Sequence, residues 1–320
     1  MKILLTGGRG AIGRELLPIL LKSGHTILSF SRAELNLNHP NLIKIIININ
    51  NIDLEGDLIQ YKTSTEIQSK INFELNNIDC ILHLAGIPSG EGKNWEDYKE
   101  GNIETTRKLV KIAEIKNINK FIFSSSISVY GYSSTTPNIE TDILNGNTNY
   151  AKSKIEAENI ILNSKINKKI ILRISSVYGK NLKSFINKLL KFNAEGIIPY
   201  PIIKNNYKSF IFIEDLIKFV IISINYENEG IFNISHPQLI EYNDIIKIME
   251  FIQNRRSLKI PLFPMFVSLE YKLKKFFFHR EESSLRPLFY SATVNPYLAI
   301  EKFKFFPKYD IHSGILKIME

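Results

Sequence analysis

Three side chains near the middle of the chain have the types and the spacing for proton transfer. Ser126 ends a serine-rich segment, and Tyr150 and Lys154 follow it at positions i and i+4 of one another. Such a pair shares one face of a helix, so the ammonium can lie beside the phenol. Tyrosine has an unperturbed pKa of about 10, and an adjacent cation favours the phenolate, which brings the phenol closer to acid/base work at neutral pH. Alone, Tyr-x-x-x-Lys is more often a surface pair than a site.

A glycine-rich segment near the N-terminus has the spacing of a phosphate-binding turn. Gly7, Gly10 and Gly13 form Gly-x-x-Gly-x-x-Gly between an apolar run at residues 2–6 and an amphipathic stretch at residues 15–21. Glycine permits a tight turn and lets backbone N–H groups approach a pyrophosphate, and the dipole of the following helix favours the anion. An isolated triplet can be a turn without a ligand. Its place after the first strand of an alternating pattern favours a dinucleotide site.

Strands that alternate with helices would carry both features. Apolar, strand-like runs occur at residues 2–6, 26–30, 43–49, 79–84, 120–123, 169–174 and 209–213. Helical patterns lie between them, for example at residues 105–116 and 153–163. This alternation predicts an α/β fold with a Rossmann doubly wound parallel sheet covered on both faces. The serines at 124–126 then leave a strand at its carboxyl end, where open α/β sheets bind ligands.

The chain changes character after Pro237, where helices, prolines and aromatic residues become frequent. A length of 320 residues is enough for about two domains. We expect residues 1–174 and 208–236 to form a nucleotide-binding Rossmann domain. Residues 175–207 and 237–320 would form a smaller C-terminal substrate-binding lobe.

The composition is that of a soluble globular protein. Apolar residues make up 44% and charged residues 23% of the chain, which excludes a disordered tail, a collagen-like fibre and a membrane bundle. No run reaches the ~18 uncharged apolar residues of a membrane span. The single cysteine, Cys80, lies in an apolar run, where a buried thiol and a reducing compartment are expected. These features predict a cytoplasmic protein.

The net charge of +9 is unevenly distributed. Residues 1–170 hold 20 basic and 18 acidic side chains, whereas residues 171–320 hold 21 and 14. Within the second half, residues 251–280 carry seven basic side chains and one acidic side chain. A solvated lysine-rich face is one interpretation, and attraction for a phosphorylated substrate or an acidic membrane surface is the other. Because no recognition motif accompanies the charge, a nucleic-acid partner is not expected.

Taken in order along the chain, these motifs resemble the extended short-chain dehydrogenase/reductases, also called the NAD-dependent epimerase/dehydratase family. Residues 6–13 resemble the cofactor turn of that family, residues 56–58 the segment whose Asp meets adenine, and residues 83–86 the loop beneath the cofactor. The most specific match is at residues 120–131. With the arginines discussed below, the residues expected to bind NAD(P) are Gly7, Arg9, Gly10, Ala11, Ile12, Gly13, Arg32, Asp57, Leu58, Leu84, Ala85, Gly86, Tyr150 and Lys154.

The resemblance implies hydride transfer between a sugar-like alcohol or ketone and a nicotinamide, without a metal. Tyr150 would exchange the proton on the reacting oxygen, and Ser126 would hold that oxygen by a hydrogen bond. Lys154 would lower the pKa of Tyr150 and bind the nicotinamide ribose. Lys208 is expected to join Ser126 and Tyr150 in contacting the substrate.

Two residues reduce the number of family branches to which the chain could belong. The 4,6-dehydratases place Asp-Glu directly after the catalytic hydroxyl, where this chain has Ile127 and Ser128. The 4-ketoreductases and the 4-epimerases acting on UDP-glucose or UDP-N-acetylglucosamine remain. Residues 177–185 and 205–209 look most like bacterial polysaccharide enzymes that reduce a 4-keto nucleotide sugar, which favours the reductase. Lys208 stands where that branch has Arg, and lysine keeps the charge but loses bidentate binding of a diphosphate.

Two arginines bear on the choice of cofactor. An NAD enzyme of this fold usually ends its second strand with an acid that binds the ribose 2′-hydroxyl. Here the strand ends Ser29-Phe30-Ser31-Arg32, with no acid, and Arg9 lies in the glycine turn. Guanidinium groups at this place favour NADP over NAD, although both could be solvated surface residues.

The resemblance and the distribution of charge also indicate partners. The substrate would be a nucleotide sugar, UDP-linked by resemblance, and residues 251–280 would make a peripheral membrane contact. Members of the family pair two long helices into a homodimer, and residues 105–116 and 153–163 are the candidates here. A function of another class, a non-catalytic NAD(P)-sensing or scaffold protein, stays open, but such members usually lose the Tyr or the Lys.

Overall fold

The computed structural model describes residues 1–55, 58–61, 65–91, 94–132, 136–278 and 285–320. The chain divides into two compact units. The first comprises Met1–Ser125, Lys152–Leu172 and Val220–Ile231, and the second comprises Ser126–Ala151, Arg173–Phe219 and Phe232–Glu320. These boundaries differ from the expected domains, since Ser126–Ala151 packs with the second unit. The division into a cofactor domain and a substrate lobe stays a prediction.

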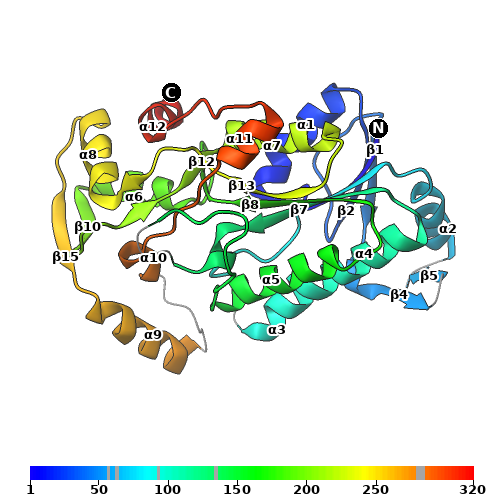
Figure 1. Cartoon of the computed structure of the whole chain (residues 1–320), viewed down its shortest axis with the longest axis horizontal. Coiled ribbons are helices and arrows are strands. Elements are labelled where there is room, and N and C mark those ends of the chain that lie inside the picture. Colours follow the sequence, from blue (N-terminus) through cyan, green and yellow to red (C-terminus); the bar gives the residue numbers. More distant parts are fainter. Residues whose placement is uncertain (56–57, 62–64, 92–93, 133–135, 279–284) are drawn as a thin grey trace. The chain divides into compact units, whose positions relative to one another are not determined.

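A seven-stranded sheet forms the centre of the fold, in the order β13-β8-β7-β6-β1-β2-β3 (Figure 1). The pairs β1–β2, β2–β3, β1–β6 and β6–β7 are parallel. This arrangement confirms the predicted Rossmann doubly wound sheet. The chain crosses from one side of β1 to the other between β3 and β6, so the switch point lies at the carboxyl ends of β1 and β6. The strands are β1 (Lys2–Thr6), β2 (Thr26–Ser31), β3 (Leu42–Ile46), β6 (Cys80–His83), β7 (Lys120–Ser126), β8 (Lys168–Ile174) and β13 (Gly230–Ile234).

One face of the sheet carries a large hydrophobic core. Strand residues such as Leu4, Leu28 and Phe121 pack there with Leu109 of α4 (Thr105–Ile115) and Ile161 of α5 (Asn149–Leu162). Because side chains alternate along a strand, the neighbours of these residues point to the opposite face, where α1 (Ala11–Lys22) lies (Figure 1). Complete burial of one Leu, Ile or Phe side chain stabilises the fold by roughly 1.5–3 kcal/mol.

Cys80 begins the central strand β6 and is completely buried. Burial raises the pKa of its thiol to about 12. The expected burial of the thiol is therefore confirmed, and its raised pKa keeps it protonated near neutral pH.

The segment after β2 departs from the expected strand boundaries. The strand expected at residues 43–49 is β3 and ends at Ile46, and a short 3₁₀ turn follows at Ile49–Asn51. Asn48 caps this turn, since its side chain accepts a hydrogen bond from the Asn50 N–H at 3.2 Å. An antiparallel pair, β4 (Ile52–Glu55) and β5 (Leu58–Tyr61), comes next and leads to α2 (Thr65–Glu74).

The described residues of the second unit form three two-stranded sheets. The pairs β10–β15 and β12–β9 are parallel, and β11–β14 is antiparallel. The strand expected at residues 209–213 is β12, which ends where α7 begins at Ile213. The elements of this part of the chain are β9 (Ser176–Tyr178), α6 (Phe185–Glu195), β10 (Ile197–Pro201), β11 (Tyr207–Lys208), β12 (Phe210–Phe212), α7 (Ile213–Asn225), β14 (Ile240–Glu241), α8 (Tyr242–Ile252), β15 (Leu258–Leu262), α9 (Met265–Phe278), α10 (Arg286–Phe289), α11 (Tyr297–Phe303) and α12 (Ile311–Met319).

Two kinds of feature are absent from the described ranges. None of their helices combines the length and the apolar character that crossing a bilayer requires. None of their His, Cys, Asp and Glu side chains gather in threes as a metal site would need.

Candidate functional site

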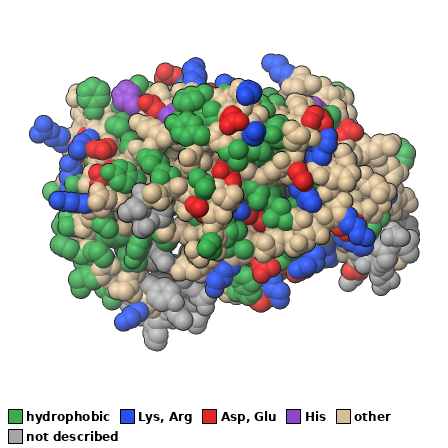
Figure 2. Space-filling view, viewed as in Figure 1, with side chains coloured by type: hydrophobic (Ala, Val, Ile, Leu, Met, Phe, Trp, Pro, Cys, Tyr) green, Lys and Arg blue, Asp and Glu red, His purple; other side chains and the backbone are tan. Residues whose placement is uncertain are grey.

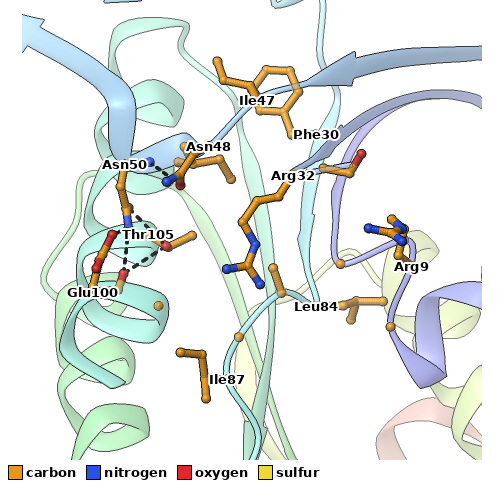
Figure 3. Close-up of a pocket in the computed structure, with 18 of the residues that line it drawn as sticks. Arg9, Phe30, Arg32, Ile47, Asn48, Asn50, Leu84, Ile87, Glu100 and Thr105 are labelled. Atoms are coloured by element: carbon orange, nitrogen blue, oxygen red, sulfur yellow. Dashed lines mark hydrogen bonds between the residues drawn. The ribbon is translucent and has the colours of Figure 1, made fainter. Parts of the chain in front are cut away.

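A cavity of about 530 Å³ opens in the first unit at the carboxyl ends of β1, β2, β3 and β6 (Figure 3). It is lined by residues 7–10, 30–32, 47–50 and 84–87, together with Asp97, Glu100, Gly101 and Thr105. This is the switch point of the sheet, where open α/β folds bind ligands. Of the residues expected to bind the cofactor, the cavity brings together Gly7, Arg9, Gly10, Arg32, Leu84, Ala85 and Gly86.

The glycine turn is shaped by backbone contacts that a side chain would break. Gly7 has φ +80°, and a Cβ atom there would lie 2.6 Å from the backbone N of Ala85. A Cβ atom on Gly13 would lie 2.2 Å from the carbonyl oxygen of Gly7. Both glycines are therefore required by close packing.

The N-terminus of α1 is free to receive an anion. Gly10 is its N-cap and supplies no side-chain hydrogen bond, and the first turn holds no acidic residue. The first N–H groups of a helix have no intrahelical partner and carry a partial positive charge. Ala11 and Ile12 bring their N–H groups to this end, beside the cavity, as a dinucleotide phosphate requires.

Arg9 and Arg32 stand on two sides of the cavity. Arg9 lies on the turn between β1 and α1, and Figure 3 shows Arg32 extending its guanidinium from the end of β2 into the space. Both side chains are exposed, and neither forms an ion pair with any carboxylate in the described parts of the chain. The end of β2 presents Ser31 in place of an acid, and its hydroxyl donates to the carbonyl of Ala33 at 2.6 Å.

The chain after β3 forms a wall that the sequence did not reveal. Asn50 donates from Nδ2 to the carbonyl of Glu100 at 3.0 Å and accepts from the Thr105 hydroxyl at 3.2 Å (Figure 3). These bonds hold the wall against the start of α4. The expected adenine contact Asp57 lies outside the described residues, and Leu58 begins β5.

Asn102 holds the loop that follows β6. It lies in the π-helical turn Lys99–Glu104, and its Oδ1 accepts from the N–H of Ile87 at 2.6 Å. Its Nδ2 donates to the carbonyl of Ile87 at 3.2 Å and to the hydroxyl of Ser153 on α5 at 2.8 Å. One buried amide thus fixes the cavity-lining loop and ties it to the helix that carries Lys154.

His83 is held in one neutral form. The hydroxyl of Thr106 donates to the carbonyl of Asn102 at 2.6 Å, so it accepts from Nε2 of His83 at 3.0 Å. Nδ1 of His83 then accepts from the hydroxyl of Thr6 at 2.7 Å. Burial, and secondly the charge of Lys154, lower the pKa of His83 to about 3. This ring stays uncharged near neutral pH and serves packing and hydrogen bonding.

Lys154 is a buried cation. It is 5% exposed, its Nζ donates to the carbonyl of Ser124 at 2.8 Å, and the ring of Phe123 lies 4.5 Å from it. Burial lowers the pKa of Lys154 to about 8, and the carboxylate of Glu158, one turn further along α5, opposes this effect. Glu158 is itself fully buried and accepts a hydrogen bond from the hydroxyl of Ser125. Lys154 is therefore still mostly charged at pH 7.

Ser126 and Tyr150 belong to the second unit. Ser126 ends β7 and caps the 3₁₀ turn Ile127–Tyr130, its hydroxyl accepting from the N–H of Ser128 at 3.2 Å. Tyr150 is half-buried in the first turn of α5, one helical turn before Lys154. The predicted Tyr-x-x-x-Lys pair therefore lies on a helix, as its spacing requires.

Lys208, the expected substrate contact, is buried within the second unit. Its side chain is 6% exposed and donates to the carbonyl of Tyr290. Burial lowers the pKa of Lys208 to about 7. Its ammonium is therefore already hydrogen-bonded to the protein backbone.

The chain is similar in sequence to members of one known family. The model of the "NAD dependent epimerase/dehydratase family" matches residues 3–235. A UDP-glucose 4-epimerase of Erwinia amylovora is 28% identical over 165 residues, 50% of this chain and 48% of that relative, so the chain spans about half its length. A dTDP-4-dehydro-6-deoxyglucose reductase of Escherichia coli is 29% identical over 273 residues, 80% of this chain and 83% of that relative.

A solved structure shares the fold over nearly the whole chain. It is the UDP-glucuronic acid 4-epimerase from Bacillus cereus in complex with UDP-glucuronic acid and NAD. The TM-score is 0.76 at 23% identity, with 99% of this chain and 97% of that chain covered. At this identity the likeness concerns the fold.

Proposed function

Because this chain belongs to the NAD-dependent epimerase/dehydratase family, we propose that it is a nucleotide-sugar oxidoreductase that transfers a hydride at C4 of the sugar. The observation that carries the proposal is the buried ammonium of Lys154, one helical turn after Tyr150. A buried lysine that keeps its charge is costly unless that charge is used or compensated. Here its charge favours the phenolate of the neighbouring tyrosine.

The roles follow from this placement. Tyr150 exchanges the proton of the reacting sugar oxygen, and Ser126 donates a hydrogen bond to that oxygen. A nicotinamide bound here would supply or accept the hydride at the sugar carbon. Oxidation thus removes a proton and a hydride from the C4 alcohol, and reduction returns both. Lys154 lowers the pKa of Tyr150 and binds the nicotinamide ribose.

The cavity supports NADP as the preferred cofactor. The glycine turn and the free N-terminus of α1 fit a pyrophosphate, and the end of β2 holds no acid for a ribose 2′-hydroxyl. Arg9 and Arg32 line the same space without a carboxylate partner in the described residues. The 2′-phosphate of NADP would meet these guanidinium groups. Fluorescence titration with NADPH and NADH tests this preference, and equal affinities would contradict it.

We favour the 4-ketoreductase reaction, because NADPH suits net reduction and Ile127 replaces the Asp of the 4,6-dehydratases. The alternative is a 4-epimerase on UDP-glucose or UDP-N-acetylglucosamine, which is supported by the epimerase relatives. Incubation with 4-keto and 4-hydroxy UDP-sugars, followed by NADPH absorbance and by NMR of the sugar, separates the two. Stoichiometric NADPH oxidation supports the reductase, whereas C4 interconversion without net NADPH change supports the epimerase.

A Tyr150→Phe variant tests whether the protein is an enzyme at all. We expect it to bind NADPH like the unmodified chain and to lose turnover, since only the phenol hydroxyl is removed. If neither the unmodified chain nor the variant turns over any of these sugars while both bind the cofactor, the non-catalytic NAD(P)-sensing or scaffold function replaces our proposal.

We propose a homodimer formed through α4 and α5, by analogy with the family. Leu162, at the end of α5, is 40% exposed and would be covered in such a dimer. Light scattering on the purified chain measures the mass, and a Leu162→Glu variant should shift it toward the monomer. The cytoplasmic compartment stays a prediction.

A further inference from the structure

The second unit has a surface on which large apolar side chains and basic side chains lie together. It is formed by residues 255–272, which include β15 and the start of α9, and by Ile197 of β10. We call it the β15–α9 surface. We propose that the β15–α9 surface docks the protein on an anionic lipid membrane, independently of the reaction at the cavity.

The strand part of this surface exposes apolar side chains on one face. Leu258 and Ile260 are two positions apart on β15 and therefore point the same way. Ile197 pairs with Leu258 in register, so it lies on the same face. The exposed fractions are 65% for Leu258 and 50% for Ile197. Contiguous exposed apolar side chains of this size usually mark a binding surface.

The helical part continues this apolar character. Met265, Phe266 and Leu269 lie on one side of the first turns of α9, and Met265 is 69% exposed. The ring of Phe263, just before the helix, lies 6.3 Å from that of Phe266. Apolar side chains on the first turns of a helix can enter the boundary between headgroups and acyl chains. Hydrophobic side chains and Lys or Arg side chains crowd the left edge of Figure 2, where Figure 1 places β10 and β15.

The charges of the surface favour anionic lipid as the occupant. Residues 255–272 carry Arg255, Arg256, Lys259 and Lys272 against Glu270. Lys259 lies 3.6 Å from the carboxylate of Glu250 on α8, which leaves the surface with a net positive charge. Glu270 accepts a hydrogen bond from the N–H of Leu285. Basic side chains close to a membrane attract its anionic lipids.

A second copy of the chain suits the surface less well. In a two-fold dimer the same patch meets itself, so the arginines and lysines would face their own equivalents. Like charges brought together in this way oppose association. An anionic membrane supplies the opposite charge and an apolar layer at once.

Vesicle co-sedimentation of the full chain tests the proposal. We expect binding to vesicles of phosphatidylcholine with phosphatidylglycerol, little binding to phosphatidylcholine alone, and loss of binding as salt is raised. Arg256→Gln with Lys272→Gln should weaken binding about tenfold or more. Met265→Ser with Leu269→Ser should weaken it severalfold, and Leu258→Ser tests the strand separately in case α9 is perturbed.

Matched controls lie in the first unit. Lys22→Gln with Lys165→Gln removes two exposed cations, and Phe73→Ser removes an apolar side chain that is 72% exposed. Neither should change vesicle binding, and circular dichroism should report folded protein throughout. Absence of binding to anionic vesicles, or equal binding to both compositions, overturns the proposal. A dimer that is lost in the Met265→Ser and Leu269→Ser variant, without vesicle binding, would assign the surface to a second copy.

Discussion

The two units use positive charge differently. The first places a few cations singly: Lys154 is buried beside the end of β7, and Arg9 and Arg32 stand at the cavity. The β15–α9 surface of the second unit instead gathers exposed cations among apolar side chains. A single cation at the site acts on one neighbouring group, so replacing it should have a large effect on activity or cofactor binding. The cations of the β15–α9 surface act through their total charge, so replacing one of them should have only a small effect on binding.

Of the three lysines that are buried among the residues described, Lys154 of the first unit and Lys208 of the second differ in their surroundings. Both donate to backbone carbonyls, and burial lowers the pKa of Lys154 to about 8 and that of Lys208 to about 7. Lys154 also has the carboxylate of Glu158, which favours its charged form, whereas burial alone accounts for the shift of Lys208. Glu158 therefore helps Lys154 to keep its charge at neutral pH.

The largest effect is expected from Lys154→Met. Removing the cation beside Tyr150 should lower turnover of the 4-keto UDP-sugar by about 10²–10⁴-fold, the usual range of acid/base assistance. Lys152→Met is the matched control, since Lys152 is exposed on the same helix. The rate of NADPH oxidation measures both. Equal losses in the two variants would mean that the position of Lys154 has no special role.

Arg32→Ala should come next. A charge-assisted hydrogen bond contributes about 1.5–3 kcal/mol, so affinity for NADPH should fall about tenfold or more while affinity for NADH changes little. Arg14→Ala removes an exposed arginine of α1 and controls for net charge. Cofactor titrations of the two variants decide the matter. An equal loss for both cofactors would place Arg32 away from the 2′ position.

A Lys208→Met variant tests how the buried ammonium of Lys208 affects the free energy of unfolding. The folded chain releases the Lys208 proton near pH 7, whereas the unfolded chain holds it to about 10.4. Between these values the unfolded state binds more protons, so Lys208 makes the free energy of unfolding rise with pH by about 1 kcal/mol per unit. The variant should lack this part of the rise and keep the smaller part that Lys154 contributes. Urea unfolding at pH 6.5 and pH 8.5 measures it, and parallel curves for both proteins would show that Lys208 keeps its proton when folded.

The smallest effect is expected from Glu158→Gln. The amide can still accept from Ser125, but it no longer favours the charged form of Lys154, so the pKa of Lys154 should fall further below about 8. As the pH is raised, the activity of the variant should therefore begin to fall at a lower pH than that of the unmodified protein. Near pH 8 the variant should be severalfold less active. Glu156→Gln, on the exposed side of α5, is the control. A uniform loss at every pH would indicate disturbed packing instead.

The sequence predicted the parts that depend on periodicity and spacing. The alternating runs predicted six strands of the seven-stranded sheet, but they missed β13, and the run at residues 209–213 is β12, which pairs with β9 outside that sheet. The spacing Gly-x-x-Gly-x-x-Gly predicted the turn, because its backbone contacts exclude any Cβ atom at Gly7 and Gly13. The wall at residues 47–50 was missed, since the Asn- and Ile-rich segment around it has no clear register. Its place depends on Asn50 binding Glu100 and Thr105, which are distant in sequence.

Burial was the other property that spacing could not reveal. Lys208 was expected at a substrate on the basis of its position in a motif, but its surroundings come from the chain around Tyr290, 82 positions away. Glu158 lies in no motif of the sequence. Only its burial beside Lys154 in the structure indicates a role for it.

Labelling of the single cysteine can measure the free energy and the rate of opening of the central sheet. Cys80 begins the central strand β6, with β1 on one side and β7 on the other, and none of its surface is exposed. A thiol reagent can reach it only after these neighbours separate, and only the thiolate reacts. With no other cysteine in the sequence, all labelling reports openings that expose this one thiol. The labelling rate across reagent concentrations therefore yields the free energy and the speed of that opening, and bound cofactor should slow it.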